Sequence, residues 1–202
     1  MPELRLYGRL PSTLAANRRR QQAEETRNAI LTSGLELFEE RGFNEVSVEQ
    51  ITRRAGVAKG SFYTHFSTKS DLIVAEFWVI DEYYKQYADR NLRRYKSAGE
   101  KLLAFTRAQM KYVRDVVGNT KLKILYANQT LEAGSQKVIT NRDRQWHNIV
   151  RSIITEGQDA GQFRTDLSAE RLTLLFNRTA RGVFLDWCIS GGDFDLVKEG
   201  VT

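Results

Sequence analysis

A capping box and a glycine place a pair of short helices near the N-terminus. Ser47, followed three residues later by Gln50, forms the capping box, which satisfies two free backbone N–H groups and begins a helix. Gly56 ends that helix, since glycine readily takes the left-handed conformation of a helix C-terminus. Phe62 and Phe66 stand four residues apart, so they share the buried face of a second short helix. The pattern predicts two helices that cross at a tight turn.

The outer face of the second short helix combines small and polar side chains. Gly60 and Ser61 keep its start slender, so its backbone can approach a major groove about 12 Å wide. Residues 46–70 carry four Lys or Arg against Glu49, a net charge of +3, which favours phosphate docking. The segment therefore predicts a helix-turn-helix that binds duplex DNA. The alternative is a helical hairpin that only packs, because short capped helices are common.

Longer helices flank this pair. Ile30, Gly34, Leu37 and Phe38 recur at three- and four-residue spacing, which predicts an amphipathic helix from about Thr26. Residues 68–71 (Thr-Lys-Ser-Asp) form a further N-cap signature that begins a long helix. Later amphipathic stretches predict helices over residues 100–117, 122–132, 136–160 and 168–189.

No segment has the pattern of a strand, so the predicted fold class is all-α. The expected domains are a three-helix domain with the helix-turn-helix over residues 22–70 and a helical bundle over residues 71–202. Residues 1–21 contain two prolines and the run Arg18–Arg20 without a sustained apolar period, which predicts a poorly ordered basic arm. This arm is either a solvated terminus or a segment that reaches phosphates or the minor groove.

Composition narrows the classes of partner and compartment. The 31 Lys and Arg residues against 25 Asp and Glu give a net charge of +6, which suits a polyanionic partner. The single Cys188 excludes an intrachain disulfide and a CxxC metal site. No apolar run approaches the roughly 20 residues of a membrane span, and the N-terminus lacks a secretory signal. We therefore expect a cytoplasmic protein that needs no metal, cofactor or membrane.

The run from Thr26 to Leu72 resembles the N-terminal domain of the TetR family of transcriptional regulators. The matching positions are Ile30, Leu37, Phe38, Gly42 and Phe43 in the first helix, Ser47, Val48, Ile51, Ala55, Gly56 and Val57 in the second, and residues 59–66 with Lys69 in the third. Residues 157–166 are similar to the family's usual link into its next-to-last helix. Gly34 stands where the family usually has alanine, and we interpret this glycine as a point of close packing.

The resemblance implies a set of DNA contacts at the starts and on the outer faces of these helices. The expected DNA-binding residues are Ser47, Lys59, Gly60, Ser61, Tyr63, Thr64, His65 and Lys69. Their chemistry agrees, since the Tyr63 hydroxyl can donate to phosphate and Thr64 can meet a base edge. His65 fits a packing role as well as a contact.

The resemblance also implies an effector-binding and dimerisation domain from about residue 71. The pocket candidates are Trp78, Tyr83, Phe105, Tyr112, Tyr126, Trp146 and Phe176, although each also suits ordinary core packing. The helix near the C-terminus is apolar on more than one face and has small residues, which suits a two-fold interface. Its interface candidates are Leu172, Leu175, Thr179, Gly182, Val183 and Trp187.

These inferences together favour a sequence-specific DNA-binding regulator. The family implies a homodimeric repressor that a small-molecule effector releases from a palindromic operator. A constitutive regulator without a ligand fits the same residues, and a protein-interaction helical module is a further alternative. An enzyme is not expected, because His65 and His147 lie on different elements and no GxSxG, HExxH or P-loop spacing occurs.

Overall fold

The computed structural model describes residues 12–131 and 136–201, and every α-helix and shorter helical turn in these ranges belongs to one of two helical domains. Strands are absent from the described residues, which confirms the all-α prediction. None of the described helices combines the length and the apolarity needed to cross a bilayer.

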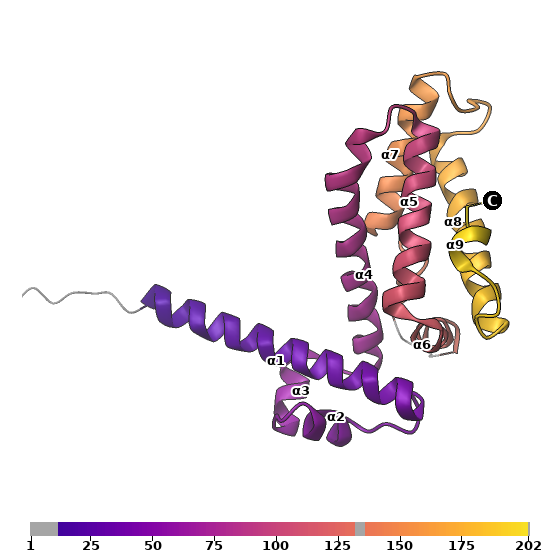
Figure 1. The fold of residues 1–202 in the computed structure, drawn as a ribbon. Coiled ribbons are helices and arrows are strands. Elements are labelled where there is room, and N and C mark those ends of the chain that lie inside the picture. Colours follow the sequence, from indigo (N-terminus) through magenta and orange to yellow (C-terminus); the bar gives the residue numbers. More distant parts are fainter. Residues whose placement is uncertain (1–11, 132–135, 202) are drawn as a thin grey trace, which may run out of the picture.

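The N-terminal domain consists of α1 (Ser12–Arg41), α2 (Val48–Arg54) and α3 (Lys59–His65). Figure 1 shows α2 and α3 beneath the C-terminal half of α1. The three helices share one hydrophobic core. Each contributes a completely buried side chain to it: Ile30 from α1, Ile51 from α2 and Phe62 from α3. This apolar contact holds the short helices, which would be marginal alone.

Helix α1 begins at Ser12, well before the expected start near Thr26, so the prediction of a disordered arm over this stretch is wrong. Residues 16–25 are exposed and consist largely of good helix formers such as Ala, Arg, Gln and Glu. A helix that buries no face has no apolar period, and for this reason the extension left no pattern in the sequence. Figure 1 shows it projecting away from the body; residues 1–11 of the expected arm lie outside the described residues.

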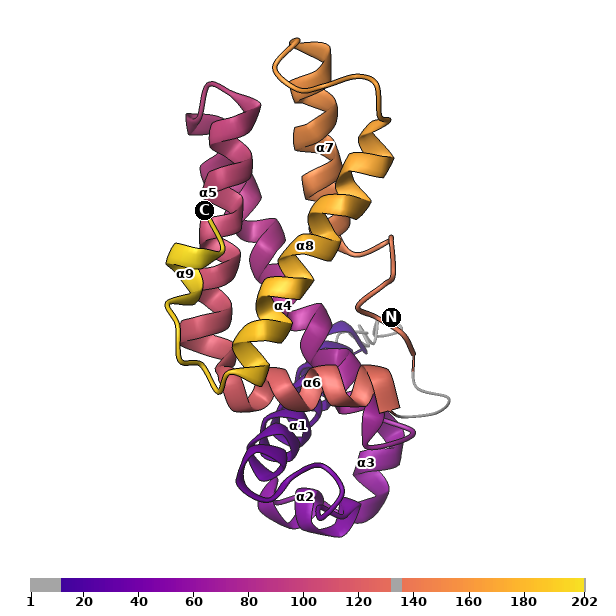
Figure 2. The same ribbon diagram turned by 90° about the vertical axis from the view of Figure 1, so that its right-hand side faces the viewer.

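The C-terminal domain is a helical bundle with a crossing helix at its base. Its elements are α4 (Ser70–Asn91), the 3-10 turn η1 (Leu92–Arg94), α5 (Ala98–Tyr112), its π-helical end η2 (Val113–Val117), α6 (Asn119–Leu131), α7 (Gln145–Asp159), α8 (Ala169–Ile189) and α9 (Leu196–Glu199). Helix α4 runs from the N-terminal domain into the bundle (Figure 1). Figure 2 shows α6 crossing the base of the bundle, where it packs against both α1 and α8.

Helix α7 begins at Gln145, so the expected start at residue 136 is wrong. The Gln129 side chain of α6 accepts hydrogen bonds from the backbone N–H groups of Val138 (2.7 Å) and Ile139 (3.2 Å). These bonds stabilise a non-helical path for residues 136–144. A glutamine that captures backbone groups nine and ten residues away has no local signature in the sequence.

Gly34 confirms the interpretation of close packing. An added Cβ atom would lie 2.5 Å from Cδ1 of Leu72, at the crossing of α1 and α4. Leu72 is completely buried, so its side chain has little room to move. Glycine at this position lets the two helices approach each other.

Candidate DNA-binding surface and ligand cavity

The two short helices are held rigidly enough to present a surface. The capping box forms as predicted: Ser47 Oγ accepts from the Gln50 N–H (3.2 Å), and the Ser47 N–H donates to Gln50 Oε1 (2.7 Å). Gly56, with φ of +68°, makes the turn between α2 and α3. Arg54 joins α2 to α1 through ion pairs with Glu40 (2.6 Å) and Glu36 (3.3 Å).

The α3 segment buries its two phenylalanines and exposes Tyr63 together with small and polar residues. Phe62 and Phe66 lie in the core at 0% and 4% exposure, whereas Tyr63 is 55% exposed. Gly60 and Thr64 are exposed as well, and no other side chain or loop lies within 4 Å of a Cβ built on Gly60. The outer face of α3 is therefore open and slender, as docking in a major groove requires.

The remaining predicted DNA-binding residues differ in their exposure and in their contacts with other side chains. Ser61 and His65 are half-buried, and Ser47 is exposed at the cap of α2. Lys59 is exposed and forms an ion pair with Glu49 of α2, and this hydrogen bond holds the pKa of Glu49 below its usual range. Lys59 must exchange that carboxylate for a phosphate to contact DNA.

Lys69 has a structural role that sequence reasoning missed. Its ammonium donates to the carbonyl oxygens of Phe43 (2.9 Å) and Val46 (2.7 Å), and it lies 4.7 Å from the centroid of the Phe43 ring. These contacts hold the loop that leads into α2. A DNA contact by Lys69 stays a prediction, but its positioning of this loop is what the structure shows.

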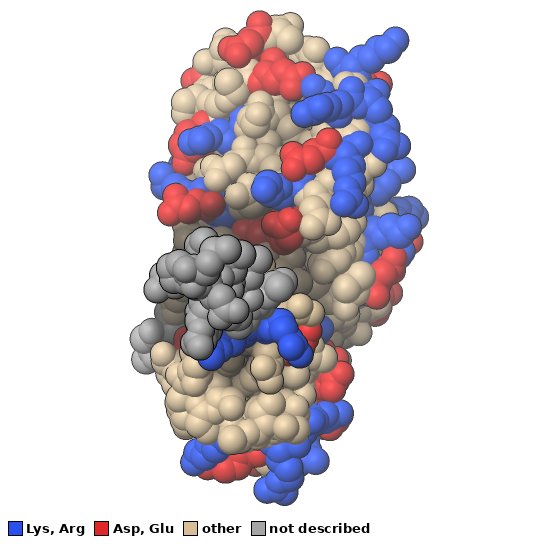
Figure 3. All heavy atoms as spheres, turned by 90° about the vertical axis from the view of Figure 1, so that its left-hand side faces the viewer, with Lys and Arg blue, Asp and Glu red and all other residues tan. Residues whose placement is uncertain are grey.

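Positive side chains accompany the open face of α3. Figure 3 shows Lys and Arg residues gathered at the lower end of the molecule, where α2 and α3 lie. Arg53 at the end of α2 is exposed and has no ion-pair partner among the described residues, so it is available to phosphate. Sequence reasoning counted its charge without placing it in the site.

A cavity of about 610 Å³ lies between α4 and α5. Tyr83 and Tyr87 of α4 and Tyr112 of α5 line it, and Tyr83 and Tyr112 stack with ring centroids 3.9 Å apart. Burial raises the pKa of both stacked tyrosines, which keeps their hydroxyls as donors. Two cations one turn apart on α5, Arg107 and Lys111, also line it, together with the carboxylates of Glu100 and Asp115.

The seven predicted pocket residues do not all line this cavity. Of the seven, Tyr83 and Tyr112 line the cavity, and Phe105 is buried beside it against Tyr87. Trp78 is 40% exposed outside the cavity, and Phe176 packs against the core elsewhere.

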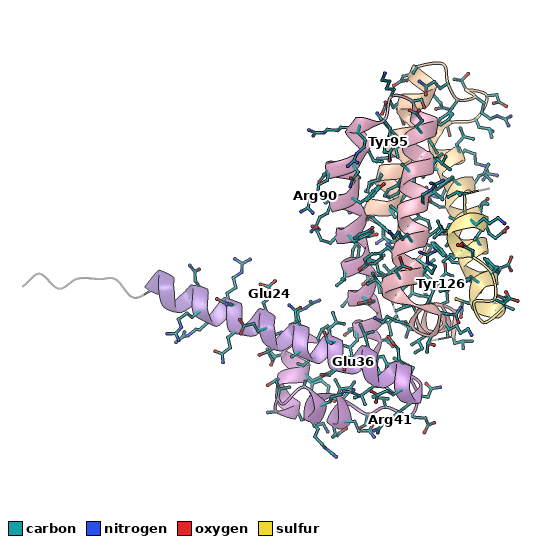
Figure 4. All side chains as sticks on the ribbon, viewed as in Figure 1. Glu24, Glu36, Arg41, Arg90, Tyr95 and Tyr126 are labelled. Atoms are coloured by element: carbon teal, nitrogen blue, oxygen red, sulfur yellow. The ribbon has the colours of Figure 1, made fainter. Side chains whose placement is uncertain are left out.

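Tyr126 and Trp146 do not line this cavity either. Figure 4 shows Tyr126 near the base of the bundle, at the opposite end from Tyr95, which lines the cavity. Trp146 borders a separate, smaller cavity. The sequence analysis did not single out Arg107 and Lys111, which line the α4–α5 cavity. Their four-residue spacing places two cations on one face of a helix, and this spacing could have indicated them.

The predicted interface residues also differ in exposure. Leu175 is 39% exposed, and Thr179 and Gly182 are exposed beside it on α8. Leu172 and Val183 are half-buried. Trp187 is only 6% exposed because it belongs to the core of its own chain, so it offers little surface to a partner. The exposed stripe continues instead to Leu185 and Ile189.

The junction between the domains is electrostatic as well as apolar. Lys121 of α6 lies 3.4 Å from Glu39 of α1 and 3.6 Å from Glu76 of α4. Burial raises the pKa of Glu76, and the nearby ammonium opposes this effect. One lysine of the crossing helix therefore contacts both the N-terminal domain and the connecting helix.

A helix-turn-helix joined by one long helix to a helical bundle with a cavity defines a class of DNA-binding regulators. The sequence comparison agrees: residues 30–75 match the model described as "Bacterial regulatory proteins, tetR family", and residues 78–201 match "YsiA-like protein, C-terminal region". The chain belongs to the TetR family of bacterial transcriptional regulators.

Relatives and solved structures of this kind extend over nearly the whole chain. The HTH-type transcriptional regulator AcrR of Shigella flexneri is 25% identical over 91% of this chain and 88% of its own length. The fatty acid metabolism regulator protein of Bacillus subtilis is 22% identical over 83% and 86%. The structure of Thermus thermophilus FadR in complex with lauroyl-CoA superimposes with a TM-score of 0.68, at 19% identity over 86% of this chain and 89% of that one.

Proposed function

We propose that this regulator acts as a homodimeric repressor whose two α3 helices read a palindromic operator, and that an amphipathic anion releases it. The observation that carries the proposal is the open outer face of α3: Phe62 and Phe66 lie in the core, whereas Gly60, Tyr63 and Thr64 are exposed. A two-fold dimer would place two such faces in successive major grooves, about 34 Å apart or a multiple of this distance.

The proposed contacts follow from the exposure of each group. Tyr63 donates its hydroxyl to phosphate, and Gly60 allows the backbone to approach closely. Thr64 and Ser61 face base edges, while His65 contributes from the end of the helix. Ser47 at the start of α2 and Lys59 contact phosphates on either side of the groove.

The exposed stripe on α8 supports dimerisation. Leu175, Gly182 and Ile189 are spaced by seven residues, so they lie on one side of the helix with Thr179 between them. Small residues in such a stripe allow two helices to pack closely about a two-fold axis. We assign this stripe as the centre of the dimer interface.

The lining of the α4–α5 cavity favours an amphipathic effector. Its tyrosines, together with Leu103 and Val116, supply apolar and aromatic surface, and Arg107 and Lys111 supply two cations. The FadR structures of Bacillus subtilis and Thermus thermophilus are complexes with stearoyl-CoA and lauroyl-CoA, and these molecules combine an apolar chain with anionic phosphates. We propose a long-chain acyl-CoA thioester as the effector class.

Helix α4 provides the physical link between effector and operator. It carries Tyr83 and Tyr87 in the cavity and begins directly after α3. A ligand that moves α4 relative to α6 must strain the contacts of Lys121 with both Glu39 and Glu76. By linkage, the factor by which the effector weakens DNA binding equals the factor by which DNA weakens effector binding.

Two matched tyrosine variants test the proposal. Duplex fragments enriched from random DNA by the wild-type protein serve as ligands in fluorescence anisotropy, with lauroyl-CoA added as effector. We expect Tyr63→Ala to weaken operator binding while dimerisation and helix content are retained. Tyr95→Ala, at the cavity rim, should keep operator affinity and lose sensitivity to lauroyl-CoA.

The possible outcomes separate the parts of the proposal. Unchanged operator affinity in Tyr63→Ala would contradict the docking of α3. Operator binding that no concentration of lauroyl-CoA alters would reject the acyl-CoA effector and favour a constitutive regulator. Duplex affinity that is indifferent to salt would reject DNA binding itself, because phosphate contacts release counterions.

A further inference from the structure

Arginines dominate a second, smaller cavity of about 180 Å³ at the start of α7. Its lining residues come from α7, the middle of α8 and residues 139–142 of the segment that leads into α7. Four guanidinium groups border it, those of Arg142, Arg144, Arg178 and Arg181. It shares no lining residue with the cavity between α4 and α5, so it is a distinct site.

Carboxylates neutralise only two of these four arginines. Arg144 pairs with the buried Asp81 at 2.7 Å, and Arg142 pairs with Glu170 at 3.3 Å. In the described part of the chain, Arg178 and Arg181 have no carboxylate within ion-pair distance. The cavity therefore has an excess of positive charge.

Arg181 shows the effect of that excess. Its guanidinium is half-buried and donates to the carbonyl oxygen of Ile139 at 3.0 Å. Burial lowers its pKa, and the charges of Arg178 and Arg144 add to this effect. An anion in the cavity would relieve both the repulsion and the loss of hydration.

Two residues that line the cavity each have a buried polar atom with no partner among the residues that the structure describes, the Nε1 of Trp146 and the Oδ1 of Asn177. Trp146 is 6% exposed and Asn177 is 4% exposed, so solvent reaches neither side chain freely. A buried polar group without a partner destabilises the fold, because its hydrogen bonds to water are lost and not replaced. Both atoms are therefore candidates for contact with a bound ligand.

The neighbouring histidine determines which atom of Asn177 is left over. His147 places Nε2 3.3 Å from the Glu170 carboxylate, which can only accept, so a neutral ring in this contact donates from Nε2. Nδ1 of His147 then accepts from the Asn177 amide nitrogen at 3.2 Å. The Asn177 Oδ1 remains as an acceptor, which requires a donor on the ligand.

We propose that this cavity binds a phosphate-sized oxyanion that also carries a hydroxyl group. Arg178 and Arg181 balance its charge, the Trp146 Nε1–H donates to an oxyanion oxygen, and the Asn177 Oδ1 accepts from the hydroxyl. Hydrogen phosphate, a small hydroxy acid and the phosphate end of a larger molecule share this chemistry. The volume would hold about six waters at about 30 Å³ each, but water cannot neutralise the two surplus charges.

The test compares anions on the full-length protein at equal ionic strength. Thermal unfolding is followed by circular dichroism in sodium phosphate and in sodium chloride, and calorimetry measures phosphate binding directly. We expect phosphate to raise the Tm above its value in chloride and to bind one saturable site per chain. Arg178→Gln and Arg181→Gln should each weaken phosphate affinity about tenfold or more, as the loss of a charge-assisted hydrogen bond implies. Arg171→Gln, an exposed arginine on the same helix outside the cavity, should respond like the wild type.

Further probes identify the source and the chemistry of the anion. Protection by hydrogen phosphate but not by glycerol phosphate identifies a free ion, whereas equal protection identifies the end of a larger molecule. Lactate should protect more than acetate, which lacks a hydroxyl, and equal protection would contradict the role of Asn177. The proposal would be overturned if phosphate raised the Tm of the wild type and of all three variants by the same amount. It would also be overturned if calorimetry detected no saturable binding of phosphate. Neither result bears on operator binding.

Discussion

The buried pair of Arg144 and Asp81 supports the most demanding prediction about stability. Arg144 Nη2 lies 2.7 Å from Asp81 Oδ1, and Arg144 Nε lies 3.0 Å from Oδ2, so the contact is bidentate. The two side chains are 4% and 2% exposed. Because Asp81 belongs to α4 and Arg144 caps the start of α7, the pair joins two helices of the bundle.

Arg144→Met should strongly destabilise the protein. It would leave the buried Asp81 carboxylate with the Gln145 N–H, at 3.1 Å, as its remaining partner. Breaking one side of a buried ion pair costs about 3–5 kcal/mol, because the remaining charge is neither hydrated nor neutralised. The double variant Asp81→Leu with Arg144→Met removes both charges, and its stability should return to within about 2 kcal/mol of the wild type.

Urea unfolding followed by circular dichroism, at one fixed protein concentration, measures these differences. Lys101→Met is the matched control: it breaks the Lys101–Glu156 pair, which also joins a bundle helix to α7 but has a half-exposed carboxylate. That variant should lose no more than about 1 kcal/mol. The reasoning is refuted if Arg144→Met costs no more than Lys101→Met, or if the double variant loses the sum of both single changes.

Four further changes test other parts of the structure. Gly34→Ala should lower the free energy of unfolding by about 1 kcal/mol. Overpacking should destabilise the protein by about 1–3 kcal/mol, which exceeds the gain in helix propensity of up to about 1 kcal/mol. Increased stability would refute the close approach of α1 and α4 at this residue. Gln109→Leu should stabilise the protein by about 1–3 kcal/mol, since both polar atoms of this fully buried side chain lack partners among the described residues, and a loss in urea unfolding would contradict this. Burial raises the pKa of the Cys188 thiol to about 11, so iodoacetamide at pH 8 should modify it far more slowly in native protein than in urea; equal rates would show that the thiol is accessible. Thr64→Val should change the preferred operator sequence more than non-specific affinity, and selection from random duplex DNA that returns the wild-type motif would oppose this assignment.

The helix-turn-helix was predictable because its determinants are local. Ser47 and Gln50 are three residues apart, and Phe62 and Phe66 are four apart, so each pair acts within one turn of helix. The same short-range patterns predicted the ends of α2 and α8 to within a residue or two. The buried and exposed faces of α3 followed from periodicity alone.

The cavities were less predictable because their lining residues meet only in the folded bundle. An aromatic residue in an amphipathic helix is apolar in either setting, so sequence could not separate Tyr83, in the cavity, from Tyr126, at the base. Trp187 was assigned to the interface for its size and apolarity, but the packing of α8 against its own chain buries it.

What the amino-acid sequence determined by itself is therefore the helical class and the reading surface of α3, since caps, turns and periodicity act over a few residues. Tertiary structure alone decided the role of Lys69, whose partners Phe43 and Val46 lie more than twenty residues earlier. It also decided the start of α7, which depends on Gln129, and the gathering of Arg178 and Arg181 beside Trp146. These contacts join groups that are distant along the chain, and no local pattern records which distant groups will meet.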